Sequence, residues 1–201
     1  TAFAESGGPT SNLIPLSLSE EKEGEFPPGF KEDAGNQDKV HLDYKVFMGK
    51  RGPSMRVDLP KTGAVCLDLQ SPVRLDDDTR YLFSVLVKVK DLVLDGPCSN
   101  EKGMARGILM YVHSASGPGH QWAAVAGEGD TDGWVTVMMP FDTAVQTELK
   151  SARIFLRCQE LSGTVWFQDP VLIEAPAGFR MQPHFILENG EAVSSNLLIL
   201  K

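Results

Sequence analysis

Aromatic and hydrogen-bonding side chains gather on two neighbouring strand-like runs of the chain. Tyr111 and His113 alternate with apolar Met110 and Val112, so they are expected to share one face of one strand. Trp122 follows a Gly-Pro-Gly turn and is placed to lie beside them. Aromatic rings that stack on C–H faces, with polar groups that orient hydroxyls, are the means by which proteins hold sugars. The alternative is that Tyr111 and Trp122 pack beneath loops or in a second core.

A third run adds hydrogen-bond donors to this candidate surface. Between residues 152 and 158 the pattern has period two, with Ile154, Leu156 and Cys158 opposing Arg153, Phe155 and Arg157. Arg157 is therefore expected on a solvent-facing side of its strand, and Lys88 is a further candidate donor. The predicted ligand-binding residues are Trp122, Tyr111, His113 and Arg157.

The sequence contains no recognisable catalytic motif. G-x-S-x-G, H-E-x-x-H, the P-loop and G-x-G-x-x-G are absent, and the four histidines are not clustered like metal ligands. Paired glycosidase carboxylates stay open as an alternative, because their separation is set in three dimensions. The sequence predicts a protein that is not an enzyme.

The three cysteines include no C-x-x-C pair, which argues against a zinc site. Cys66 and Cys158 lie in strand-like runs and are predicted to be buried thiols, with a single disulfide as the alternative. The run from Asp130 to Gly133 matches only the start of a calcium loop, so a turn before the next strand is the better interpretation.

The charge balance excludes some classes of partner. Nineteen Lys and Arg stand against 27 Asp and Glu, a net charge of -8. Nucleic acids and anionic lipids require a basic surface, so a glycan or another protein is the expected partner. The longest apolar run, from Tyr81 to Leu94, is interrupted by charged residues and is too short to span a bilayer. Residues 2–5, Ala-Phe-Ala-Glu, resemble the end of an export signal, which predicts an extracytoplasmic location: secreted, periplasmic or in an organelle lumen.

Short runs rich in Val, Leu, Ile and aromatic residues alternate with Gly, Pro, Asp and Asn clusters after residue 40. Helical periodicity is absent except for one possible turn within 143–150, which predicts an all-β, antiparallel two-sheet sandwich. A turn is expected at Ser162-Gly163. The strands are expected at Val40–Met48, Ser54–Asp58, Ala64–Leu69, Arg80–Val89, Arg106–His113, Gln121–Ala126, Trp134–Met139, Ala152–Cys158 and Thr164–Ile173.

The 201 residues suit one β domain with two extensions. Residues 1–40 are predicted to form an extended arm that contributes the first strand, and residues 41–174 the sandwich itself. Residues 175–201 form a tail whose apolar end, 196–200, is expected to add an edge strand or to dock on a partner.

Several motifs occur in the order found in one protein family. They are Asn12-Leu13-Ile14-Pro15, Glu20-Glu21, Pro28-Gly29-Phe30, Gly52-Pro53-Ser54-Met55-Arg56-Val57, Tyr81-Leu82-Phe83-Ser84-Val85, Gly133-Trp134-Val135-Thr136-Val137 and Ser162-Gly163-Thr164-Val165-Trp166-Phe167-Gln168-Asp169-Pro170-Val171-Leu172. Over residues 11–174 the chain resembles carbohydrate-binding modules of the family 4/9/22 type, which have a galactose-binding-like jelly roll. Leu16, Phe30 and Gln168 depart from the family pattern of Asn, Trp and Asp.

This resemblance implies a jelly-roll fold and core positions for Trp134 and Trp166. It also implies one structural Ca²⁺ that ties the first segment to the last strand, with Glu20, Glu21 and Asp169 as carboxylate ligands. The alternative is that Glu20 and Glu21 are solvated and that Asp169 caps a turn.

Two functions remain open from the sequence. The first is a non-catalytic carbohydrate-binding module that holds a glycan by aromatic stacking and polar contacts. The second is a non-catalytic accessory subunit of a larger extracytoplasmic or lumenal protein complex, which keeps the jelly roll without binding sugar. The arm and the apolar tail favour this second possibility, because either extension could wrap a neighbouring protein.

Overall fold

The computed structural model describes residues 11–16, 22–31, 35, 38–46, 52–95, 106–116, 120–126, 129–131, 133–145, 147–175, 184–188, 191–195 and 197–199. For 120–126 and for the three segments after residue 183, the description covers the backbone. The elements are β1 (Val40–Asp43), β2 (Ser54–Asp68), β3 (Val73–Arg74), β4 (Arg80–Leu94), β5 (Gly107–Ser114), β6 (His120–Ala126), β7 (Val135–Asp142), the 3-10 helix η1 (Thr147–Lys150), β8 (Ser151–Glu174), β9 (His184–Glu188), β10 (Glu191–Ser195) and β11 (Leu197–Ile199). No helix in this described part is long and apolar enough to cross a membrane.

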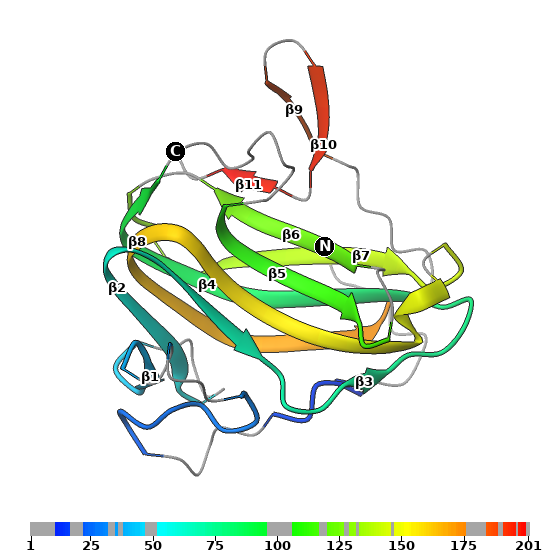
Figure 1. Cartoon of the computed structure of the whole chain (residues 1–201), viewed down its shortest axis with the longest axis horizontal. Coiled ribbons are helices and arrows are strands. Elements are labelled where there is room, and N and C mark those ends of the chain that lie inside the picture. Colours follow the sequence, from blue (N-terminus) through cyan, green and yellow to red (C-terminus); the bar gives the residue numbers. More distant parts are fainter. Residues whose placement is uncertain are drawn as a thin grey trace, which may run out of the picture.

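The predicted all-β sandwich is confirmed, and its two layers share strands. One layer runs from the second half of β2 through the first half of β8 to β5, β6 and β11. The other runs from β1 through the first half of β2 and the second half of β8 to β4 and β7. In Figure 1, β2 (cyan) and β8 (yellow to orange) are the arches that join the layers at one end. All these pairs are antiparallel except β6–β11, which is parallel.

The core lies between the two layers and is formed by alternate residues of the strands. From one layer it receives Val65, Leu67, Ile108, Met110, Val112, Ile154 and Leu156, and from the other Val57, Phe83, Val85, Val87, Val165 and Phe167. The alternation predicted for residues 152–158 is confirmed, since Ile154, Leu156 and Cys158 are buried in this core. Burial of these apolar faces is the main force that holds the layers together.

β2 and β8 each cover two strands that the sequence analysis predicted as separate. The predicted turn at Ser162-Gly163 is therefore wrong. β2 continues through residues 59–64 with shifts of register, which indicate a bulge in place of a break. β8 continues through Gly163, whose φ of +122° bends the strand without ending it. Turn-forming residues in the middle of a long strand mark a bend at the edge of a sandwich, because bending requires the same backbone freedom as turning.

We predict that Gly163→Ala destabilises the fold strongly. A Cβ at this position would lie 2.6 Å from the carbonyl oxygen of Asp91 and 2.9 Å from that of Lys90, and positive φ adds strain. The expected loss is about 2–4 kcal/mol of unfolding free energy, combining backbone strain with a steric clash. Urea unfolding measures it, with Gly133→Ala as the control because nothing lies within 4 Å of its added Cβ. Equal stability of the two variants would show that β8 does not need this bend.

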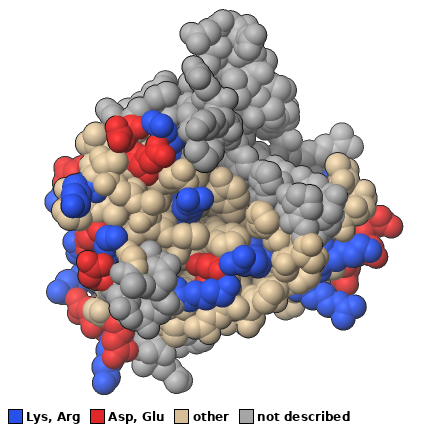
Figure 2. All heavy atoms as spheres, in the orientation of Figure 1, with Lys and Arg blue, Asp and Glu red and all other residues tan. Residues whose placement is uncertain are grey.

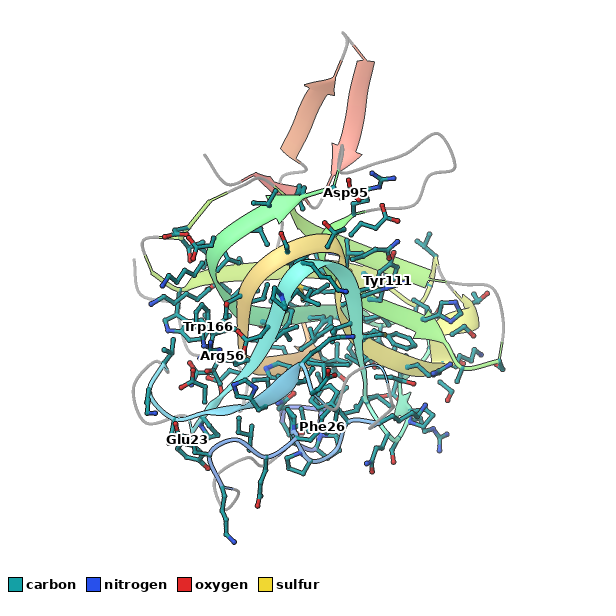
Figure 3. The ribbon with its side chains drawn as sticks, turned by 60° about the vertical axis from the view of Figure 1, so that its left-hand side comes forward. Glu23, Phe26, Arg56, Asp95, Tyr111 and Trp166 are labelled. Carbon is teal, nitrogen blue, oxygen red and sulfur yellow. The ribbon has the colours of Figure 1, made fainter. Side chains whose placement is uncertain are left out.

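A buried hydrogen bond fastens β1 to β8 on the outer side of the second layer. Trp166 Nε1 donates to Asp43 Oδ2 at 3.0 Å, and the Arg56 guanidinium lies 5.5 Å from the centre of the Trp166 ring. Arg56 and Trp166 lie together in Figure 3. Burial raises the pKa of Asp43, but hydrogen bonds donated by Trp166 and by the backbone N–H groups of Lys45 and Val46 lower it to a net value below normal.

This arrangement predicts a pH-dependent contribution to stability. Because the pKa of Asp43 is lowered in the folded protein, its carboxylate stabilises the fold above the unfolded-state pKa of about 3.9. The contribution is lost as pH falls through the folded-state pKa. Asp43→Asn should therefore cost about 1–3 kcal/mol near pH 7, and the cost should fall as the pH is lowered toward 3.

Thermal unfolding between pH 3 and pH 7 measures this difference. Asp77→Asn is the control, because the Asp77 carboxylate is exposed and its partner among the described residues is exposed Lys150. A difference between wild type and Asp43→Asn that stays constant with pH would contradict the role given to the Asp43 charge.

Candidate functional site

Half-buried side chains, with fully buried Leu109 beside them, form a patch on the outer face of the layer that contains β5. Antiparallel pairing sets Tyr111 opposite Phe155, His113 opposite Arg153, and Leu109 opposite Arg157. Residues directly opposite each other share a face of the sheet, so these side chains point away from the core. Met110 and Val112 point into the core, as the alternation in the sequence predicted.

A cavity of about 300 Å³ opens on this face, lined by Cys66, Tyr111, His113, Phe155 and Arg157. Three of the four predicted ligand-binding residues, Tyr111, His113 and Arg157, are thus brought together. Tyr111 is labelled in Figure 3, on the strand at the right of that view, away from Arg56 and Trp166. The volume lies at the lower end of the ~300–1,000 Å³ usual for small-molecule sites, which suits one or two sugar units.

For the fourth predicted residue, Trp122, the structure gives the position of the backbone. In the β5–β6 ladder Trp122 is directly opposite Tyr111, and His120 is opposite His113. The side chain of Trp122 lies outside the described part of the structure, so its part in the site stays a prediction.

Phe155 and Cys66 belong to the cavity but were not predicted as binding residues. The signal for Phe155 was present, because an aromatic residue occupied a solvent-facing position between Arg153 and Arg157. Its ring lies 4.8 Å from Arg153 Cζ and meets the His113 ring edge-on at 6.4 Å. Cys66 enters the cavity because β2 pairs with β8 at Arg157, and local sequence gives no sign of that long-range register.

The polar groups of the cavity differ in whether they have hydrogen-bond partners among the described residues. His113 Nδ1 is 2.7 Å from the carbonyl oxygen of Ser114, and since a carbonyl only accepts, this nitrogen carries the proton. Burial raises the pKa of Tyr111, while the positive charge of Arg157 acts in the opposite direction. Arg157 Nε is buried and has no hydrogen-bond partner among the described residues.

An ion triad borders the cavity. Asp68 Oδ2 accepts a hydrogen bond from Lys31 Nζ at 2.6 Å and another from Arg153 Nη2. Lys31 belongs to the segment before β1, so the triad fixes that segment against the sheet. Arg153 in turn covers the ring of Phe155, which holds this side of the cavity in place.

Other predicted positions lie elsewhere. Lys88 is opposite Trp166 in the other layer, so it cannot donate to a ligand bound beside Arg157. Trp166 is buried, but on the outer side of its layer under Arg56, and Trp134 is only half-buried, so neither belongs to the core between the sheets. The predicted burial of Trp166 is therefore confirmed, although it packs on the outer side of its layer, and the core expectation is wrong for Trp134.

The predicted calcium ligands are only partly described. Glu20 and Glu21 lie outside the described residues, whereas Asp169 lies in β8 with φ of +48°. The first described segment, residues 11–16, is nevertheless tied to the end of β8. Asn12 Oδ1 accepts a hydrogen bond from the N–H of Leu172 at 2.9 Å, and Asn12 Nδ2 donates one to the carbonyl oxygen of Pro170 at 3.2 Å. Among the described residues no group of three His, Cys, Asp or Glu could hold a metal ion. The Asn-Leu motif was the sequence signal for this junction.

Cys66 and Cys158 lie on opposite faces of the sheet, and neither forms a disulfide. Cys66 lines the cavity and Cys158 lies in the core, so the alternative of a disulfide between them is wrong. Burial raises the pKa of the Cys158 thiol far above its normal value. The prediction that both thiols are buried holds for Cys158 alone.

We predict that a thiol reagent modifies Cys66 and leaves Cys158 unmodified in the folded protein. The half-buried Cys66 is accessible from the cavity, whereas Cys158 is fully buried and protonated. Iodoacetamide labelling at pH 8 followed by peptide mass spectrometry gives the two rates, and Cys66→Ser is the control. Labelling of both residues at similar rates would contradict the assignment of the two faces.

Comparisons with known proteins support the fold of this chain and nothing beyond it. No family model matches the chain, and no curated protein matches its sequence. A cyclase from Fischerella sp. TAU matches with a TM-score of 0.51 and 14% identity, over 84% of this chain and 95% of that one. The enzymatically active domain of tailspike protein 4 of Bacteriophage CBA120 matches with a TM-score of 0.50 and 8% identity, over 74% of this chain. This chain spans 20% of the tailspike chain.

Carbohydrate-binding modules are also among the matching structures. The CBM22-1 xylan-binding domain of Paenibacillus barcinonensis Xyn10C has a TM-score of 0.49 and 15% identity, and covers 86% of this chain and 100% of that one. The likeness is one of fold. Because one fold hosts many functions, the site has to carry the functional argument.

Proposed function

We propose that this chain is a non-catalytic carbohydrate-binding module whose glycan lies on the outer face of β5, β8 and β2. The observation that carries the proposal is the cavity that combines two aromatic rings, Tyr111 and Phe155, with the polar groups of His113 and Arg157. An aromatic ring offers an apolar face to the C–H groups of a pyranose, and the polar groups select its hydroxyls.

The state of the individual groups supports a ligand in this cavity. Leaving a buried donor such as Arg157 Nε without an acceptor costs about 1–3 kcal/mol, which an acceptor from a ligand would remove. Phe155 is held by Arg153 and His113, so Tyr111 is the ring that we assign to stacking. Trp122, directly opposite Tyr111 in the ladder, extends the platform in this proposal. A protein with this role would act where glycans occur, outside the cytosol.

The alternative of an accessory subunit that binds no sugar has lost one of its supports. The apolar tail was a candidate for docking on a partner, but β11 pairs with β6 of the same chain. The backbone of this segment therefore already has a hydrogen-bonded neighbour. A structural calcium held by Glu20, Glu21 and Asp169 stays a prediction, with Asn12 already joining the two segments that it would connect.

We predict that Tyr111→Ala and Trp122→Ala each weaken glycan binding at least tenfold, about 1.4 kcal/mol, because each removes a stacking surface. Affinity electrophoresis through a panel of plant and microbial polysaccharides measures the loss. Trp134→Ala is the matched control, since Trp134 is half-buried outside this cavity.

Thermal unfolding of each variant separates lost binding from lost folding. If no polysaccharide or arrayed glycan retards the wild-type protein, the carbohydrate-binding proposal is wrong and the accessory-subunit function takes its place. If Trp134→Ala weakens binding as much as Tyr111→Ala, the glycan lies elsewhere on the molecule.

A further inference from the structure

The proposed glycan face is positively charged in a protein that is acidic overall. The cavity and the ion triad beside it hold three cations, Lys31, Arg153 and Arg157, and one carboxylate, Asp68. The whole chain carries -8. Figure 2, in the orientation of Figure 1, shows Lys and Arg atoms around a small patch of Asp or Glu atoms on a surface that is otherwise formed by uncharged residues.

Within this face the carboxylate is already used. Asp68 Oδ2 binds both Lys31 and Arg153. The net charge of these three residues together is therefore one positive unit. Arg157 makes no ion pair with any described residue. The residues beside it in the neighbouring strands are Cys66 and Leu109, and neither carries a compensating carboxylate.

Arg157 thus presents an uncompensated cation at a sugar-sized cavity that also holds aromatic rings. A guanidinium group is planar and donates two parallel hydrogen bonds to a carboxylate, a geometry that a neutral hydroxyl does not match. Charge-assisted hydrogen bonds of this kind are roughly twice as strong as neutral ones. The site therefore favours a sugar that carries a carboxylate over its neutral counterpart.

We infer that this site recognises a uronic acid residue, whose carboxylate binds Arg157 and whose ring contacts Tyr111. The inference rests on the proposed carbohydrate-binding function and narrows its ligand class. The overall charge of -8 repels a densely charged polyanion, so the preferred ligand is a neutral glycan with isolated uronic acid residues.

The test uses pairs of oligosaccharides that differ in one group. Each probe is a neutral oligosaccharide with one glucuronic or galacturonic acid residue, and its twin has that carboxylate reduced to the primary alcohol. Isothermal titration calorimetry with the whole wild-type chain at 50 mM and 500 mM NaCl should show about tenfold to hundredfold tighter binding of the acidic probe at low salt. The preference should shrink at high salt, because salt screens charges that are partly exposed.

Variants of Arg157 test whether this residue causes the preference for the acidic probe. Arg157→Gln should bind the acidic probe and its reduced twin equally, and Arg157→Lys should keep part of the preference because it retains charge without the planar fork. Arg80→Gln is the matched control, since Arg80 is an exposed arginine on β4 in the other layer. This control should keep the wild-type ratio.

The outcomes separate the two proposals. Equal binding of both twins by the wild type overturns the uronic acid inference and leaves carbohydrate binding intact. No binding of any probe, acidic or neutral, overturns both. A preference that survives in Arg157→Gln overturns the assignment of the carboxylate to Arg157. The comparison of twins on the wild-type protein decides the inference even where the Arg157 variants fold poorly.

Discussion

Strands β2 and β8 each run through both layers of the sandwich, and the rest of the structure depends on this sharing. The first half of β8 pairs with β5 and the second half with β4, so one continuous set of backbone hydrogen bonds links the two sheets. Bending a strand without losing its ladder requires a residue that accepts unusual φ, and Gly163 provides it where the backbone of Asp91 comes closest. The apolar face of each layer then meets the other across a common core.

The same bend positions the candidate site. Because the first half of β8 lies between β2 and β5, the outward positions of three strands converge on one face, and the cavity draws Cys66, Tyr111 and Arg157 from these three strands in turn. The ion triad of Lys31, Asp68 and Arg153 then fixes one side of it. A rigid sheet that carries the site keeps the aromatic and cationic groups in place before a ligand arrives, which reduces the entropy lost on binding.

Much of this arrangement was predictable because strands have a period of two. Alternation placed Tyr111 and His113 on one side of their strand and Arg157 on the outer side of another, and both placements are confirmed. It could not decide between a bend and a turn at Ser162-Gly163, since both need the same residue types. The resemblance assigned Trp134 and Trp166 to the core. Trp166 is buried, but it lies under Arg56 on the outer side of its layer, and Trp134 is half-buried.

The sequence by itself determined the class of fold and the face on which each strand residue lies, because both follow from local periodicity and from the turn-forming residues. Only the tertiary structure decided which strands are neighbours, and therefore that Arg157 and Cys66 join Tyr111 at one cavity while Lys88 does not. It also decided that Asp68 pairs with both Lys31 and Arg153, and that among the described residues Arg157 has no carboxylate partner. Strand register is a long-range property, fixed by the packing of the whole core, and no local pattern of residues encodes it.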